Sequence, residues 1–149
     1  MITTLRHMER QYETGRSDVT PDVITYTTVI NAWARSGEAD APQKAEAVLQ
    51  RMEEGNRANG GGVKPNAMCY NTVCSAWAKS KQPGAADRAL ATFETMDRLY
   101  REGDDGVKPD VYTVTSVIDT LGKRGTVEST DRALEILRTM EERYRDTGD

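Results

Sequence analysis

Residues that could recognise a ligand recur in this chain every 44 positions. Thr27, Asn71 and Thr115 share this spacing, and each is followed by a polar residue after four positions and a cation after eight. The three sets are Thr27, Asn31 and Arg35; Asn71, Ser75 and Lys79; Thr115, Asp119 and Lys123. In a helix such spacing places the side chains along one face. Each set therefore offers hydrogen-bonding groups and a cation able to contact a phosphate. Alternatively, the polar residues are merely solvated, and the cations complement the helix dipole.

The remaining reactive residues predict neither an enzyme nor a metal or cofactor site. His7 is the only histidine, so no Ser-His or Cys-His pair is expected. Cys69 and Cys74 lie five positions apart, on different faces of a helix, and are expected to be buried as small apolar groups. The glycine run 60–62 precedes Pro65 rather than a Lys-Ser or Lys-Thr helix start, so it is no phosphate loop. We expect no catalysis, no cofactor and no small-molecule substrate.

The acidic composition of the whole chain, taken alone, argues against nucleic-acid binding. The 149 residues carry a net charge of −4 and a pI near 5.1, whereas nucleic-acid binders usually show a basic footprint. The predicted first helices nevertheless sum to +3, so the remaining residues carry −7. This division predicts a mildly basic inner surface and an acidic outer one.

The sequence contains no run of about 18 apolar residues, so no membrane span is predicted. The N-terminal residues resemble neither a secretory signal nor a transit peptide.

The elements that position these residues also follow the 44-residue period, which predicts a repeat architecture. The positions that repeat are Pro21, Pro65 and Pro109; Met8, Met52, Met96 and Met140; Tyr26 and Tyr70; Trp33 and Trp77. A first helix is predicted over 23–36, 67–80 and 111–124, with apolar residues at i, i+3, i+4 and i+7. Asp22, Asn66 and Asp110 stand as N-caps, and Gly37 and Gly125 as helix stops.

A second helix follows in each unit, over 42–55, 85–102 and 129–145. Its expected buried residues are Ala45, Leu49 and Met52; Ala89, Phe93 and Met96; Ala133, Leu137 and Met140. Tyr26 and the two tryptophans lie on the buried stripe of the first helices, so the tryptophans are expected to pack in the core.

The chain is thus divided into residues 1–22 (a second helix and turn), 23–66, 67–110, and 111–149, whose final turn is lacking. A lone hairpin cannot bury its apolar face, so the units are expected to stack into an all-α solenoid. No polar cap is evident at either end, so we expect either a segment of a longer protein or a chain whose ends are exposed.

These phrases resemble the pentatricopeptide repeat. They are Pro-Asp-Val-x-Thr-Tyr-Thr, an apolar helix ending in Ala-Arg-Ser-Gly, Ala-x-x-x-Leu-x-x-Met, and Gly-Val-Lys-Pro. The resemblance covers essentially the whole chain and implies a right-handed superhelix of helix-turn-helix hairpins. The family's unit of about 35 residues is shorter than the 44 found here, and the extra residues fall between the helices and in the second helix with its turn. Such insertions should alter superhelix geometry and base spacing.

The resemblance implies binding of single-stranded RNA, one base per repeat. The base-reading residues it implies are Thr27, Asn71 and Thr115, together with Asn66 and Asp110 as second readers and Asp22 as the second reader of a preceding unit. It implies that Ile24, Met68 and Tyr112 sandwich the base. Arg35, Lys79 and Lys123 are the candidate phosphate contacts. With the family's pairing rules, the implied sequence is 5′-A-U-purine-3′.

The family further implies a role in RNA processing, stability or translation in a mitochondrion or chloroplast. Two alternatives remain open from the sequence. One is a scaffold that binds a peptide or partner helix, which the acidic charge and long repeat favour. The other is the RNA-gripping arm of a larger enzyme.

Overall fold

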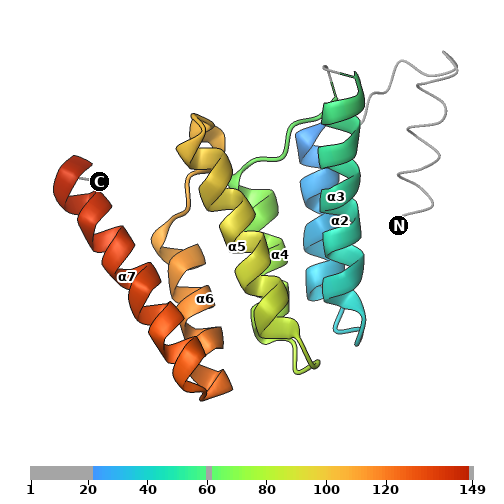
Figure 1. Cartoon of the computed structure of the whole chain (residues 1–149). Coiled ribbons are helices and arrows are strands. Elements are labelled where there is room, and N and C mark those ends of the chain that lie inside the picture. Colours follow the sequence, from blue (N-terminus) through green and yellow to red (C-terminus); the bar gives the residue numbers. More distant parts are fainter. Residues whose placement is uncertain (1–21, 60–61, 148–149) are drawn as a thin grey trace, which may run out of the picture.

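The computed structural model describes residues 22–59 and 62–147. Most of the predicted partial unit 1–22, including His7, lies outside this part. The described residues form three helical hairpins and no strand (Figure 1). The helices are α2 (Val23–Arg35), α3 (Ala41–Asn59), α4 (Ala67–Lys79), α5 (Ala85–Arg101), α6 (Val111–Arg124) and α7 (Val127–Thr147), with a short 3₁₀ helix η1 (Asp105–Val107) before α6. The predicted all-α class is confirmed.

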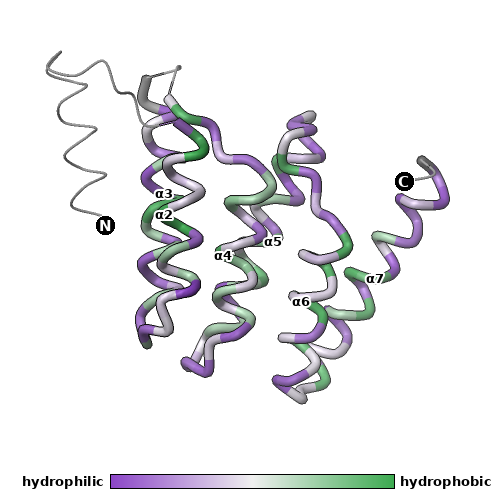
Figure 2. The backbone as a smooth tube through the Cα atoms, turned by 180° about the vertical axis from the view of Figure 1, so that it is seen from behind, coloured by the Kyte–Doolittle hydropathy of each residue, from purple (hydrophilic) through white to green (hydrophobic). Residues whose placement is uncertain are grey.

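The hairpins stack side by side in two layers. Helices α2, α4 and α6 form one layer, called here the first-helix layer, and α3, α5 and α7 form the other (Figures 1 and 2). Within the first-helix layer α4 contacts both α2 and α6, while α3 packs on α4 and α5 packs on α6. Each unit therefore buries its apolar face against the next, which is the packing of a helical-repeat solenoid.

The core follows the predicted stripes. In the first-helix layer the buried apolar residues include Tyr26, Ile30, Tyr70, Val73, Cys74, Trp77, Val117 and Leu121. Ala45 and Ala89, both fully buried, let the two helices of a hairpin approach closely. Val107 of η1 is also fully buried, and η1 packs against both α4 and α5. Burying this apolar area is the main source of stability in such a fold.

Helix ends also follow local rules. Asp22, Asn66 and Asp110 are N-caps with extended backbone, as predicted. Gly37 and Gly125 adopt positive φ values of 76° and 71°, a conformation that favours glycine and ends the first helices. The second helices are longer than predicted at several ends; α3 continues through Gly55 to Asn59. One interior glycine costs about 1 kcal/mol, which a helix packed along its length tolerates.

The predicted core is wrong at Leu137, which is 44% exposed rather than buried. Its counterparts Leu49 and Phe93 lie on helices that pack against the first helix of the next unit. No described element follows α7, so nothing in this part of the chain covers that face. Burial of this position depends on a neighbouring unit rather than on the helix itself.

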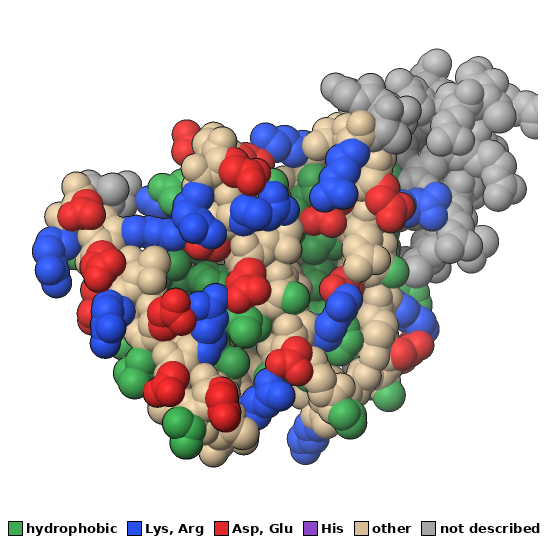
Figure 3. All heavy atoms as spheres, in the orientation of Figure 1, with side chains coloured by type: hydrophobic (Ala, Val, Ile, Leu, Met, Phe, Trp, Pro, Cys, Tyr) green, Lys and Arg blue, Asp and Glu red, His purple; other side chains and the backbone are tan. Residues whose placement is uncertain are grey.

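The outer layer is acidic through α7, which carries six carboxylates and four cations, whereas α3 and α5 are neutral. Helix α3 carries three cations and three carboxylates, and so does α5. Figure 3 shows both signs intermixed over the face of α3, α5 and α7. Arg88 donates to Glu46 of the preceding unit through Nε at 3.2 Å, and Arg132, 44 positions later, is 2.6 Å from Glu94. Oppositely charged partners on successive units explain the mixed surface.

Candidate nucleic-acid interface

Each first helix begins with a side chain that caps the helix and could also contact a ligand. Asp22 accepts the Thr25 backbone N–H at 2.8 Å, Asn66 accepts that of Cys69 at 3.2 Å, and Asp110 accepts that of Thr113 at 2.9 Å. Each cap bond uses one side-chain oxygen. The second carboxylate oxygen, or the amide NH₂ group of Asn66, remains outside the cap bond. Capping and ligand binding are therefore compatible at all three positions.

The structure brings one of the two complete predicted reader pairs into direct contact. Asn71 of α4 donates from Nδ2 to Oδ2 of Asp110, the N-cap of α6, at 3.3 Å. Thr27, by contrast, donates to the backbone oxygen of Val23 at 2.6 Å and lies 3.3 Å from Sγ of Cys69. No hydrogen bond joins Thr27 to Asn66 among the described residues. The second pair is therefore held together in the free protein, and the first is not.

Three large apolar side chains are exposed at equivalent places in the first-helix layer. Ile24, Met68 and Tyr112 are 71%, 55% and 55% exposed. Scattered exposed apolar residues are common, but one at the same position of every unit forms a regular row. The Tyr112 hydroxyl lies 2.9 Å from Oγ of Ser75 in α4, which holds the ring beside the unit boundary. These side chains are available to stack on or flank planar groups.

A hollow of about 610 Å³ opens between α4 and α6. Its lining includes Tyr112, the predicted phosphate contacts Lys79 and Lys123, and a further cation, Lys81. An aromatic ring and several ammonium groups thus share one hollow. That combination suits a ligand with both a planar base and a phosphate.

The 44-residue period does not identify Lys81 as a candidate phosphate contact, because the equivalent residues of the other units are not cations. Its counterparts 44 positions away are Gly37 and Gly125, so the period gives it no signal. The detectable signal was local, namely two lysines separated by one serine at the end of α4. Only the packing of α6 beside α4 shows that Lys81 and Tyr112 line the same hollow.

The three predicted phosphate contacts differ in their surroundings. All are exposed, but Lys123 lies 2.8 Å from Asp119, one helical turn away. Within the described residues Arg35 and Lys79 form no ion pair. The carboxylate of Asp119 reduces the positive potential at Lys123. Arg35 and Lys79 therefore present the less compensated charges.

The tryptophans belong to the packing rather than to this surface. Trp77 is 4% exposed, and its Nε1 donates to Glu46 at 3.1 Å. Trp33 is half-buried beneath Lys44, whose Nζ lies 4.3 Å from the ring centroid. Both rings are occupied by contacts with a second helix. The predicted core role of the tryptophans agrees with this arrangement.

Cys74 and Tyr70 are buried titratable residues whose side chains form hydrogen bonds to the second helices. Burial raises the pKa of the Cys74 thiol to about 12, and burial with a hydrogen bond to Glu53 raises the pKa of Tyr70. Both cysteines are buried, as predicted. In the described part of the chain, no three His, Cys, Asp or Glu residues come together as a metal site. Nor is any described helix both long and apolar enough to cross a membrane.

A family model of the pentatricopeptide repeat domain matches residues 12–80, which include α2, α3 and α4. None of the curated proteins compared with the chain matches it.

Proposed function

Residues 12–80 belong to the pentatricopeptide-repeat family, and on that premise we propose that this chain binds single-stranded RNA through its first-helix layer, with one base per repeat. The family is one of helical-repeat RNA-binding proteins. The third unit, beyond the matched segment, carries the same cap, stripe and turn residues at the same period. We therefore extend the proposal to all three units.

The observation that carries the proposal is the boundary between the second and third units. Here the Asn71–Asp110 contact and the hollow lined by Tyr112, Lys79 and Lys81 lie on the same two helices. Hydrogen-bonding groups could read a base edge, the ring could stack on the base, and the lysines could neutralise the backbone. A solvated helix face would not require this grouping.

The chemistry of the reader pairs supports a particular sequence. The Asp110 carboxylate only accepts hydrogen bonds, so it favours a base with an N–H on its pairing edge, and uracil is proposed for Asn71 with Asp110. The Asn66 amide can donate as well as accept, and adenine is proposed for Thr27 with Asn66. Thr115 alone is assigned a purine. The proposed target is 5′-A-U-purine-3′.

The acidic net charge limits the affinity rather than the mode of binding. The first-helix layer sums to +3, about one cation per unit. Phosphate contacts supply much of the affinity of nucleic-acid binders, so three units should bind weakly and lose affinity as salt rises. We propose that the role is in organellar RNA processing, stability or translation, in a mitochondrion or chloroplast, as in the family.

A protein-binding scaffold remains the second candidate because of one groove. A hollow of about 960 Å³ between the start of α6 and the end of α7 is lined by Val111, Val114, Met140 and Tyr144. Val111 and Tyr144 are 83% and 63% exposed. Exposed apolar surface of this kind often marks a protein contact.

The test is an NMR titration of the chain with two short single-stranded RNAs, one containing A-U-A and one containing C-C-C. Weak binding makes NMR the suitable method. We expect shifts at Thr27, Asn71, Thr115 and the cations of the first-helix layer, larger with A-U-A. A folded protein that shows no shift with either RNA at low salt would exclude the proposal. Shifts confined to the α6–α7 groove would favour the scaffold.

A further inference from the structure

Three side chains from two units meet around the Asn71 carboxamide. Asn71 donates from Nδ2 to Asp110 Oδ2 at 3.3 Å, and its Oδ1 accepts the hydroxyl of Thr113. The Thr113 backbone N–H donates to Asp110 Oδ1 at 2.9 Å, which fixes the carboxylate. Thr113 is 1% exposed, whereas Asn71 is half-buried at the surface. The threonine thus lies behind the amide, out of reach of a ligand in front of it.

Only one orientation of the Asn71 amide avoids an unfavourable contact. A carboxylate can only accept, so the amide NH₂ must face Asp110. The amide oxygen then faces Thr113, whose hydroxyl donates to it. A flipped amide would place its oxygen against the Asp110 carboxylate, so the carboxylate selects the orientation. Thr113 Oγ1 lies within hydrogen-bond distance of Asn71 Oδ1 and 2.9 Å from Asp110 Oδ1, so the hydroxyl joins the two side chains. The Thr113 hydroxyl therefore holds the Asn71 amide against Asp110 in the orientation that the carboxylate selects.

This orientation determines what the pair can offer to a base. One N–H of Asn71 remains available beside the acceptor oxygens of Asp110. Uracil presents an N–H between two carbonyl oxygens on its pairing edge, which complements an acceptor next to a donor. Cytosine has an unprotonated ring nitrogen there, and the carboxylate repels that lone pair. We propose that Thr113 is a positioning residue that makes the second unit prefer uracil over cytosine by holding the Asn71 amide.

The preceding unit boundary provides an internal contrast. Cys69 occupies the position 44 residues before Thr113, and its Sγ lies 3.3 Å from Thr27 Oγ1. Thr27 has no amide to orient, and a thiol is a poor donor. The hydroxyl therefore occurs at the boundary where the facing reader is an asparagine.

This inference rests on the proposed function, and its test compares base preference rather than binding alone. Wild type and Thr113→Val would be titrated by NMR with RNAs containing A-U-A and A-C-A. Loss of one positioning hydrogen bond should lower the U-to-C affinity ratio by about threefold or more. Thr113→Ser, which keeps the hydroxyl, should retain the wild-type ratio. Thr113→Cys introduces the residue found at the equivalent position 69, and it should lower the ratio as Thr113→Val does. It provides the same test if Thr113→Val does not fold.

A second background separates positioning from a structural role. With Asn71→Ser there is no amide to orient, so adding Thr113→Val should leave the U-to-C ratio unchanged. The inference would be overturned if the single variants Thr113→Val and Thr113→Cys both kept the wild-type U-to-C ratio. It would also be overturned if Thr113→Val lowered that ratio equally in the Asn71→Ser background. Failure of the wild type to bind either RNA is a different result, because it would refute the proposed function itself.

Discussion

Asn66 combines a structural task with a proposed recognition task. Its Oδ1 caps α4 by accepting the Cys69 N–H at 3.2 Å, while its NH₂ group is left for a ligand. Asparagine and aspartate are about equally good N-caps, but only asparagine carries a side-chain donor. A single substitution can therefore separate the two tasks.

Asn66→Asp should preserve stability and change base preference at the first unit. We expect the free energy of unfolding to change by less than about 0.5 kcal/mol, since the cap is retained. Preference should move from adenine toward guanine, because a carboxylate accepts from the guanine N–H groups and repels the adenine ring nitrogen. Urea unfolding and NMR titration with A-U-A and G-U-A measure the two effects.

The matched control is Asn66→Ala, which removes both tasks. It should cost about 1 kcal/mol of stability and weaken binding to both RNAs. If Asn66→Asp still favours adenine as the wild type does, Asn66 does not read the base.

At the scale of the helix, α2 and α4 differ in whether the N-cap side chain can titrate. Asp22 caps α2 and titrates, whereas Asn66 caps α4 and does not. The hydrogen bond from the Thr25 N–H lowers the pKa of Asp22 below its ordinary value of 3.8. Because the folded state has the lower pKa, the stabilisation is present above pH 3.8 and is lost as the pH falls through the folded value.

Acidification below pH 3.8 should therefore fray the start of α2 before that of α4. Carbon chemical shifts of residues 23–26 and 67–70, followed by NMR from pH 6 to pH 2, would show the difference. Asp22→Asn should remove it by making both caps non-titrating. Equal fraying of both helices in the wild type would contradict the assignment of this effect to Asp22.

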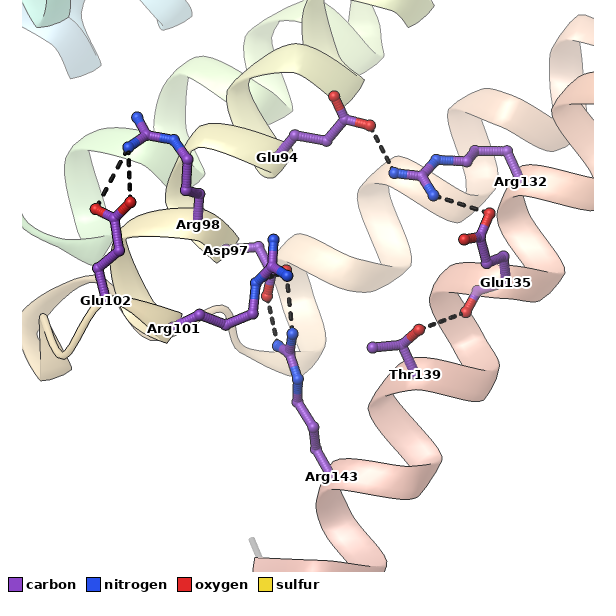
Figure 4. Close-up of polar contacts among 9 residues, drawn as sticks. All are labelled: Glu94, Asp97, Arg98, Arg101, Glu102, Arg132, Glu135, Thr139 and Arg143. Atoms are coloured by element: carbon purple, nitrogen blue, oxygen red, sulfur yellow. Dashed lines mark hydrogen bonds and ion pairs between the residues drawn. The ribbon is translucent and has the colours of Figure 1, made fainter.

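Helix α7 reaches the preceding unit through two arginines. Figure 4 shows Arg132 extending toward Glu94 and Arg143 toward Asp97 on α5. Arg143 donates to both Asp97 oxygens, one of them at 3.1 Å, and the two side chains are 27% and 14% exposed. This bidentate geometry and partial burial make the pair stronger than an ordinary surface ion pair.

Asp97→Asn removes the charge that pairs with both Arg143 and Arg101, the latter at 3.3 Å. It should lower the free energy of unfolding by about 1 kcal/mol, because the Asp97 carboxylate is partly shielded from water. Urea unfolding monitored by circular dichroism gives the value. The control is Glu102→Gln, which removes the Arg98–Glu102 pair on the same helix, where both side chains are at least half exposed. That change should stay within about 0.3 kcal/mol. Equal losses of stability in both variants would contradict the extra stabilisation assigned to the partly buried Asp97 ion pairs.

Across the whole molecule, charge is divided between layers rather than spread evenly. The first-helix layer carries +3 within a chain of net charge −4, while α3 and α5 are each neutral. Lys81, beside this layer, adds a further cation to the hollow between α4 and α6. An acidic protein can thus present a locally positive surface to a polyanion.

The salt dependence of RNA binding should report these cations one by one. The slope of log K against log salt is negative, and each lost phosphate contact with a single strand makes it less steep by about 0.7. Lys79→Ala and Lys81→Ala should each reduce the slope by roughly this amount without changing base preference. Lys64→Ala is the matched control, because Lys64 pairs with Asp104 at 3.0 Å outside the hollow. A slope unchanged in both test variants would exclude phosphate binding there.

Much of this protein was predictable because local rules act on a repeated pattern. The 44-residue period, the i, i+3, i+4, i+7 stripes, the three N-caps and the glycine stops each depend on residues close in sequence. The structure agrees with them because one helix turn decides each feature. The candidate readers were placed by the family resemblance, and their roles remain predictions.

Tertiary packing decided what depends on residues in neighbouring units. The Asn71–Asp110 contact joins residues 39 positions apart, whereas the first reader pair forms no such bond. The hollow containing Lys81, the contact of Thr113 with Asn71 and the exposure of Leu137 also depend on how one hairpin lies against the next. A periodic sequence specifies each hairpin and the face that it buries. The distances between side chains of successive hairpins are determined only by the angle and spacing at which those faces pack.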